Sequence, residues 1–510
     1  MLTDFTALTA ELSRISNHRR VGRVATVGTA SLEIAGLTHQ ARIGDQVSIA
    51  LAGGRDLGGE IVGISESRAR AMTYAPLEGA AVGREVTLLG QAGVHPDVSW
   101  VGRIVDAFGQ PLDGRPLAPG AASATLRRAP PPPATRKGLG ARLATGLAVF
   151  DTILPVARGQ RIGVFAGSGI GKSSLLADLA RGIEADIVVY ALIGERGREL
   201  RDFTDNVLGP EGMARAVVVA ATSDQAPLIK RRATWMAMAT AEVFRDQGLH
   251  VLLLLDSLTR FAEAHREIAL TAGEAPSLRG FPPSTANLIA ALCERAGPGP
   301  WAAGDITGIF SVLVAASDMD EPIADITRGV LDGHVVLDRA IAERGRFPAI
   351  DVRRSVSRSL PAIASEAENA QLARVRRVLT AYENAALMIQ TGLYVPGSDA
   401  AIDEAIELWP RLDAFFTEPS PEGVPASFER LGTLLARYPP RPSGRTIDRP
   451  GPTSNRQQRG TVSHRFVGRS ARAGAPAITV LWQSARLSGT GSRARIWQLP
   501  NPRAAFLSAQ

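Results

Sequence analysis

The sequence of 510 residues is poor in cysteine, in lysine and in long apolar runs. Cys293 is its single cysteine, which excludes an intramolecular disulfide, and nothing beside it suggests a metal cluster or a thiol nucleophile. We therefore expect a reduced, cytoplasmic setting. No apolar run approaches the ~18 residues of a transmembrane helix, and the N-terminus lacks the long apolar stretch of a secretory signal. These absences favour a soluble globular protein.

Charge is distributed unevenly along the chain. The net charge is +7, but residues 441–510 contain 12 arginines and one acid, Asp448, so that residues 1–440 carry a net charge of −4. The basic end supports weak association with anionic surfaces at most. The acidic body also lacks a surface pattern of interleaved aromatic and basic residues. We therefore expect no specific nucleic-acid partner.

The first 92 residues carry two different patterns. In residues 1–20, apolar side chains recur every three or four positions, which predicts an amphipathic helix. Such a helix could dock a partner helix, touch anionic lipid or pack on its own domain. In residues 21–92, short β-prone runs alternate with glycine and aspartate turns, and this rhythm of six or so short strands predicts a small closed β-barrel. The predicted runs are VGRVATV, SLEIAGL, DQVSIAL, GGEIVGI and EVTLLG. The apolar helix positions are Leu2, Phe5, Leu8, Leu12 and Ile15.

Residues 93–364 have the pattern of an α/β domain. Near its start, the four consecutive prolines within residues 127–137 lack backbone donors and predict an extended crossing between structural units. From about residue 146 to 359, apolar strands alternate with helical stretches, which predicts a parallel sheet covered on both faces. The predicted strands are 161–166, 187–193, 216–221, 251–255 and 309–314.

A helical domain is predicted over residues 365–440. Ser365 and Glu368 form a capping-box pattern at the start of a helical periodicity that runs over 366–390 and stops at Gly392. Beyond residue 440 the sequence is rich in Arg, Ser, Gly, Pro and Gln, with isolated Trp482 and Trp497. We interpret residues 441–510 as disordered by composition.

Residues 166–173, AGSGIGKS, follow an apolar strand and precede a helical run, which is the setting of a phosphate-binding loop. Glycines let backbone N–H groups curl round a triphosphate, Lys172 reaches the β and γ phosphates, and Ser173 supplies a ligand for Mg²⁺. A chance match is improbable because the chain has three lysines against 54 arginines. The predicted nucleotide-binding residues here are Ala166, Gly167, Ser168, Gly169, Ile170, Gly171, Lys172, Ser173 and Ser174.

Two carboxylates stand at the ends of other predicted strands. Asp256 closes the apolar run VLLLLD, where a carboxylate is suited to hold Mg²⁺ through a water. Glu195 follows the strand at 187–193 and could polarise the attacking water, while Arg196 beside it could bind the γ-phosphate. From spacing alone, the run GERGRE is also compatible with a solvated charge cluster in a loop.

Several long motifs occur in order along the chain, namely FAGSGIGKSS, IGERGRELRDF, LLLLDSLTRFAEAHREIAL, DGHVVLDRAIAERGRFPAID and SVSR. Together they resemble the catalytic-subunit superfamily of the rotary F/V-type ATPases. Within it, the chain resembles the type III secretion branch, most closely the flagellar protein-export ATPases. The resemblance covers about residues 20–440. It implies an α/β fold with a RecA-type P-loop core, a preceding β-barrel and a following helical domain.

The resemblance also implies residue roles. Glu195 would be the general base that activates water, Arg196 would contact the γ-phosphate, and Asp256 would be the distal Mg²⁺ carboxylate. Phe347, in GRFPAID, resembles the aromatic residue that stacks on adenine, with an ordinary core phenylalanine as the alternative. Arg358, at the end of SVSR, resembles an arginine finger that reaches a neighbour's site, which implies a homohexamer. Non-catalytic synthase subunits have glutamine in place of Glu195, so the glutamate favours hydrolysis.

As an export ATPase, the chain would hydrolyse Mg²⁺-bound ATP to drive release, unfolding and export of flagellar proteins. The implied partners are other copies of itself, a stator-like negative regulator at the N-terminal helix and a coiled-coil stalk protein. Export-gate membrane proteins and chaperone–substrate complexes are implied as well. The implied location is the cytoplasm, with peripheral association at the inner face of the cytoplasmic membrane.

Three alternatives stay open at this point. An injectisome type III secretion ATPase would share all of these residues, and their chemistry does not separate it from the flagellar enzyme. A proton-translocating synthase subunit is disfavoured because catalytic and finger residues occur in one chain. A hexameric nucleic-acid translocase is disfavoured by the acidic body.

The last 70 or so residues depart from the resemblance, because members of the family generally end near positions 434–438. Arginine-rich, acid-poor sequence without pattern is what a GC-rich gene yields when it is read in another frame. Our hypothesis is that this end is frameshifted or accreted. Detection of peptides from residues 450–510 by mass spectrometry of the native protein would overturn it.

Overall fold

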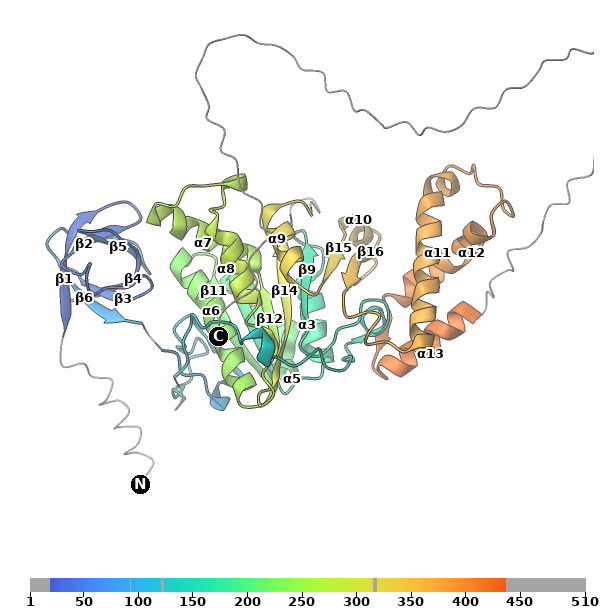
Figure 1. Ribbon diagram of the computed structural model, residues 1–510, viewed down its shortest axis with the longest axis horizontal. Coiled ribbons are helices and arrows are strands. Elements are labelled where there is room, and N and C mark those ends of the chain that lie inside the picture. Colours follow the sequence, from blue (N-terminus) through green and yellow to red (C-terminus); the bar gives the residue numbers. More distant parts are fainter. Residues whose placement is uncertain (1–18, 92, 121–122, 315–318, 437–510) are drawn as a thin grey trace, which may run out of the picture. The chain divides into compact units, whose positions relative to one another are not determined.

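The computed structural model describes residues 19–91, 93–120, 123–314 and 319–436 (Figure 1). The predicted helical positions in residues 2–15 and the end of the chain from residue 437 lie outside the described residues. Within the described part, no helix is long and apolar enough to span a membrane.

The first described unit is a closed barrel of six antiparallel strands in the order β1-β2-β5-β4-β3-β6 (Figure 1). Side chains alternate between its interior and its surface, as in β3, where Val47 and Ile49 are buried and their neighbours are half-exposed. The predicted barrel is confirmed, with a strand at β5 that was not among the predicted runs. The strands are β1 (Arg20–Val27), β2 (Leu32–Ala35), β3 (Gln46–Ala50), β4 (Asp56–Ile64), β5 (Ala69–Thr73) and β6 (Glu85–Gly90).

A nine-stranded sheet forms the centre of the chain, in the order β16-β15-β9-β14-β12-β10-β11-β7, with β13 paired to β14. The sheet is parallel from β15 to β7, as predicted, and β16 and β13 add to it in antiparallel fashion. The strands are β7 (Arg103–Val105), β9 (Arg161–Ala166), β10 (Ile187–Glu195), β11 (Ala216–Thr222), β12 (His250–Asp256), β13 (Gly297–Pro298), β14 (Asp305–Leu313), β15 (Gly333–Leu337) and β16 (Ile350–Ser357).

Helices cover both faces of this sheet, which explains why its strands are apolar at nearly every position. In β10, Ile187, Val189 and Ala191 face one core and Val188, Tyr190 and Leu192 face the other. One core includes α6 (Pro227–Asp246), α7 (Leu258–Ala272), α8 (Ser284–Cys293) and α9 (Pro322–Val330). The other includes α3 (Lys172–Gly182) and the π-helical segment η3 (Phe203–Leu208).

The proline-rich crossing differs in one detail from the predicted extended segment. Pro133–Thr135 forms a single 3-10 turn, η2, while Pro132 before it keeps an extended backbone. Proline is compatible with the first position of such a turn, because its missing N–H has no intrahelical acceptor there. The remaining short elements are η1 (Val98–Trp100), α2 (Ala148–Asp151), α4 (Gly197–Asp202), α5 (Gly209–Met213), η4 (Leu278–Gly280) and α10 (Arg339–Glu343).

Three helices follow the sheet, namely α11 (Glu366–Gln390), α12 (Ala400–Phe415) and α13 (Val424–Ala436). The predicted capping box is present, since the Glu368 amide donates to Ser365 Oγ at 3.3 Å and the Ser365 amide donates to the Glu368 carboxylate at 2.7 Å. A small two-stranded ladder joins β8 (Gly146–Leu147) to β17 (Pro419–Ser420). The prediction of a helical C-terminal region is confirmed.

Candidate active site

The phosphate-binding loop connects the buried strand β9 to α3. Ala166 is the last residue of β9, and Lys172 is the first of α3. Gly169 and Gly171 have φ angles of 77° and 86°, which residues with a side chain adopt only at a cost. The loop therefore curls before an eleven-residue helix whose first N–H groups lack intrahelical acceptors. This geometry suits an anion such as a phosphate.

Lys172 and Asp256 meet on the α3 face of the sheet. Lys172 Nζ donates to Asp256 Oδ1, and Ser311 Oγ from β14 donates to the same oxygen at 2.6 Å. The lysine and aspartate side chains are 9% and 1% exposed. The two charges are thus buried as a pair, which is the condition under which an interior tolerates them. The structure places the predicted lysine and the predicted strand-end carboxylate in direct contact.

Glu195 reaches the same region through an irregularity in β10. The register between β10 and β11 shifts between Ile193 and Glu195, and Gly194 has a φ of 78°. Without this bulge, alternation would place Glu195 on the face of Ile193, away from α3. Burial raises the pKa of Glu195, the charge of Asp256 raises it further, and Lys172 opposes the rise. Glu195 therefore lies within electrostatic reach of the Lys172–Asp256 pair.

Arg196, by contrast, points to solvent. Its side chain is 74% exposed and forms an ion pair at 3.3 Å with Glu199 on α4. The structure does not bring Arg196 into the cluster of Lys172, Asp256 and Glu195.

Phe347 lies against the loop. A Cβ placed on Gly171 would be 3.3 Å from Phe347 Cδ1, so the ring borders the loop where α3 begins. The residue is 54% exposed, which does not fit an ordinary core phenylalanine. Arg339 of α10, to which the sequence analysis assigned no role, donates to the Ser168 carbonyl oxygen at 3.2 Å. That contact joins α10 to the loop, and no spacing in the sequence indicates it.

Arg358 follows the last residue of β16 and is exposed. Its guanidinium donates to the Arg328 carbonyl oxygen at 3.3 Å rather than to a residue of the loop. It also lines a cavity of about 850 Å³ between β16 and α11. The structure therefore separates Arg358 from the buried cluster within one subunit.

The donor set of the site fits Mg²⁺. Ser173 offers an exposed hydroxyl at the start of α3, and Asp256 offers a carboxylate. Oxygen donors are the ligands that Mg²⁺ prefers, and it usually keeps waters and substrate phosphates as its other ligands. The described residues contain no group of three or more His, Cys, Asp or Glu arranged to hold a metal. A site built from one hydroxyl, one carboxylate and a substrate is consistent with that composition.

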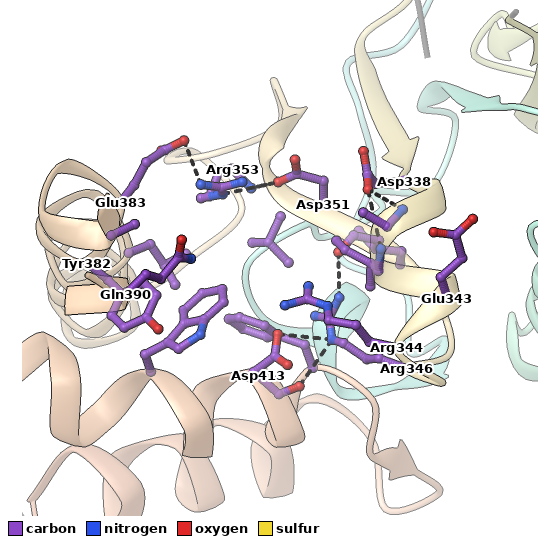
Figure 2. Close-up of a pocket in the computed structure, with 18 residues that line it drawn as sticks. Asp338, Glu343, Arg344, Arg346, Asp351, Arg353, Tyr382, Glu383, Gln390 and Asp413 are labelled. Atoms are coloured by element: carbon purple, nitrogen blue, oxygen red, sulfur yellow. Dashed lines mark hydrogen bonds and ion pairs between the residues drawn. The ribbon is translucent and has the colours of Figure 1, made fainter. Parts of the chain in front are cut away.

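A second cavity, of about 570 Å³, lies between α10 and β16 on one side and α11 and α12 on the other (Figure 2). Arg346 pairs with Asp413 at 3.1 Å, and Arg353 pairs with Glu383 at 2.5 Å. The rings of Tyr382 and Trp409 stack with centroids 4.9 Å apart. No residue of the loop lines this cavity, so it is separate from the phosphate site.

Two family models match the chain. The nucleotide-binding domain of the ATP synthase alpha/beta family matches residues 146–357, which include the loop, Asp256, Glu195 and Phe347. The C-terminal domain of the type III secretion ATPase EscN matches residues 364–433, which contain α11, α12 and most of α13.

Curated relatives match over nearly their whole length. The flagellum-specific ATP synthase of Caulobacter vibrioides is 44% identical over 438 residues, which is 84% of this chain and 99% of the relative. That of Bacillus subtilis is 41% identical, over 80% of this chain and 92% of the relative. The type 3 secretion system ATPase of Pseudomonas syringae is 39% identical, over 84% and 98%.

Solved structures agree with these matches. The assembled ATPase EscN of the enteropathogenic E. coli type III secretion system superposes with a TM-score of 0.75 at 33% identity, covering 81% of this chain and 99% of EscN. EscN in complex with its central stalk EscO gives a TM-score of 0.73 at 34% identity, with the same coverage. The chain therefore belongs to the ATP synthase alpha/beta family, in the branch of the flagellum-specific and type III secretion ATPases.

Proposed function

We propose that this chain is the ATP hydrolase of a flagellar type III protein export apparatus, where hydrolysis drives release, unfolding and export of flagellar proteins. One observation carries the proposal. At the carboxyl ends of β9, β10 and β12, Lys172 of the phosphate-binding loop pairs with Asp256, and Glu195 lies within electrostatic reach of that pair. It occurs in a chain 44% identical to a flagellum-specific ATP synthase.

The loop residues bind and orient the triphosphate. Backbone N–H groups of residues 166–174 and the positive end of α3 receive the phosphate oxygens. Lys172 exchanges its contact with Asp256 for the β and γ phosphates, which places its charge where negative charge gathers. The Ser173 hydroxyl and the Asp256 carboxylate hold Mg²⁺, which neutralises phosphate charge when it is bound.

Glu195 acts as the general base. Its carboxylate takes a proton from the attacking water as the water oxygen bonds to the γ-phosphorus, and the bond to the β-phosphate oxygen breaks to release ADP. A base works best when its pKa lies near the operating pH, and burial together with Asp256 moves the pKa of Glu195 in that direction. The bulge at Gly194 is the feature of the fold that aims this carboxylate.

The exposed groups complete the site. Phe347, beside the loop and half-exposed, offers a ring face for the adenine base. Arg196 binds the γ-phosphate once a nucleotide is present. Arg358 faces solvent and serves the site of the neighbouring subunit, so that six identical chains form a ring with shared sites. The solved structure of assembled EscN supports such an assembly.

Partners and location follow from the same proposal. A coiled-coil stalk protein is supported by the EscN complex with its central stalk EscO. A stator-like regulator binds the N-terminal residues, and export-gate membrane proteins and chaperone–substrate complexes bind elsewhere on the ring. The enzyme works in the cytoplasm at the inner face of the cytoplasmic membrane.

An injectisome ATPase is the second candidate, supported by 39% identity to the Pseudomonas syringae type 3 secretion system ATPase and by the EscN C-terminal match. Cells that lack this chain separate the two. Loss of extracellular flagellin supports the flagellar function. Normal flagellin export with loss of a secreted virulence effector would assign the chain to the injectisome.

Phosphate release by the purified full-length chain tests the enzymatic part of the proposal. The rate per subunit, measured with Mg²⁺ and ATP at increasing protein concentration, should rise steeply as rings form, because each site needs Arg358 of a neighbour. A flat, low rate at every concentration would contradict the shared site and would favour a subunit that needs a different partner.

A further inference from the structure

Tyr190 is a buried tyrosine in the middle of β10, on the strand that ends at Glu195. It is 0% exposed, and its hydroxyl has no hydrogen-bond partner among the described residues. Its ring packs against Phe203 of η3, with centroids 4.5 Å apart and planes tilted by 54°. Phenylalanine would make the same ring contact without burying an unsatisfied hydroxyl, so the packing does not explain the oxygen atom.

The strand register places this hydroxyl close to the active site. Tyr190 pairs with Leu254 of β12, and Leu192 pairs with Asp256. Tyr190 and Asp256 therefore lie on the same face of the sheet, the face covered by α3. Two residues of strand advance by ~6.6 Å, which is within the reach of a tyrosine side chain that leans along the strand.

Both active-site carboxylates act on Tyr190. Burial raises the pKa of the Tyr190 hydroxyl well above its ordinary value, and the charges of Asp256 and then Glu195 raise it further. The hydroxyl therefore keeps its proton and is available as a donor. Asp256 accepts from Lys172 and Ser311, but Lys172 is also the group that must reach the phosphates.

We propose that Tyr190 is a positioning residue for the carboxylate of Asp256, an inference that rests on the proposed hydrolysis. When Lys172 turns to the phosphates, the Tyr190 hydroxyl donates a hydrogen bond to the Asp256 carboxylate, directly or through one water. The carboxylate then keeps two donors, Ser311 and Tyr190, and holds its orientation beside Glu195. The unsatisfied hydroxyl of this structure is thus the donor that the nucleotide-bound state uses, retained at a cost in stability.

Tyr190→Phe tests this role, because it removes the oxygen and keeps the ring on Phe203. In the full-length chain we expect kcat for ATP to fall roughly tenfold, the range for loss of a hydrogen bond to a charged group. KM for ATP and the affinity for ADP should stay at the wild-type value. The melting temperature should be unchanged or higher, because a buried unsatisfied hydroxyl has been removed.

Tyr74→Phe is the matched control. Tyr74 is a half-buried tyrosine, the residue after β5, and its hydroxyl accepts a hydrogen bond from Gln46 Nε2 at 3.1 Å. Its substitution should lower the melting temperature and leave kcat unchanged, which is the opposite of the pattern expected for Tyr190→Phe.

Two results would overturn the inference while the hydrolytic function stands. One is a wild-type kcat in Tyr190→Phe. The other is a fall in kcat that comes with a lower melting temperature and a raised KM, since a merely structural role has that signature. A wild-type chain that releases no phosphate from ATP would overturn the proposed function and this inference together.

Discussion

The buried and the exposed halves of the proposed site differ in how the chain holds them. Lys172 and Asp256 are 9% and 1% exposed and pair with each other, whereas Arg196 and Phe347 are 74% and 54% exposed. Arg358 is exposed too, and its guanidinium contacts the Arg328 carbonyl. In the proposed mechanism, one subunit preorganises the groups that bind phosphate, and a neighbouring subunit supplies the cation that stabilises the charge of the transition state.

The largest effect is expected in the buried half. Lys172→Ala removes the charge that meets the β and γ phosphates and leaves Asp256 buried without its cationic partner. We expect phosphate release to fall below detection at every protein concentration, with weakened ATP binding. Isothermal titration with ATP and a phosphate-release assay measure the two effects.

Lys230→Ala is the control for that substitution. Lys230 is one of the chain's three lysines, a half-buried residue whose Nζ donates to the Ser223 carbonyl oxygen at 2.8 Å. The Lys230→Ala variant should hydrolyse ATP at the wild-type rate. Full activity in Lys172→Ala would contradict the assignment of the loop.

Arg358→Ala addresses the exposed half. An arginine supplied by a neighbour raises the rate of nucleotide hydrolases about 10³- to 10⁵-fold, so most of the rate gained on assembly should be lost. ATP binding should be unchanged, because Arg358 does not contact the loop of its own subunit. Mixing Arg358→Ala chains with Lys172→Ala chains sharpens the comparison. In a mixed ring, some sites combine the intact Lys172 of an Arg358→Ala subunit with the intact Arg358 of a Lys172→Ala neighbour.

Recovery of activity in that mixture would show that the two halves come from different subunits. Arg354→Ala, at an exposed arginine within β16, is the control and should leave the rate unchanged. A full rate in Arg358→Ala alone would contradict a shared site.

Glu195→Gln separates nucleotide binding from chemistry beside the buried Lys172–Asp256 pair. Glutamine keeps the shape of the side chain but takes no proton from water, and loss of a general base costs about 10²- to 10⁴-fold in kcat. ATP affinity should stay near the wild-type value, as measured by equilibrium binding. A variant that hydrolyses at more than a tenth of the wild-type rate would contradict the role of Glu195 as base, because loss of the base should cost at least about 10²-fold.

Local sequence patterns predicted where the phosphate-binding loop and the strand-end carboxylate lie along the chain, but they did not predict the contacts between elements. The loop between β9 and α3 and the capping box at Ser365 depend on neighbouring residues, so the sequence showed them directly. The bulge at Gly194, the pairing of Lys172 with Asp256 and the contact of Phe347 with the loop depend on strand register and tertiary packing. Strand β5, ARAMT, was missed because its alanines and arginine show little apolar alternation.

The smallest effect is expected for a substitution of Glu199, which contacts Arg196 of the exposed half and also acts on the pKa of Glu195. This carboxylate pairs with the exposed Arg196 at 3.3 Å, and it also raises the pKa of Glu195, after the larger contributions of burial and Asp256. A base works deprotonated, so kcat should fall as the pH falls through a pKa above the ordinary 4.5 of a glutamate. Glu199→Gln removes one negative neighbour, which should lower that pKa and move the acidic limb of the kcat profile to lower pH. The same substitution frees Arg196, so a change confined to KM for ATP would mean that Glu199 acts through Arg196 alone. An acidic limb at or below the ordinary glutamate pKa in the wild-type chain would show that Glu195 is not the group that sets the limb.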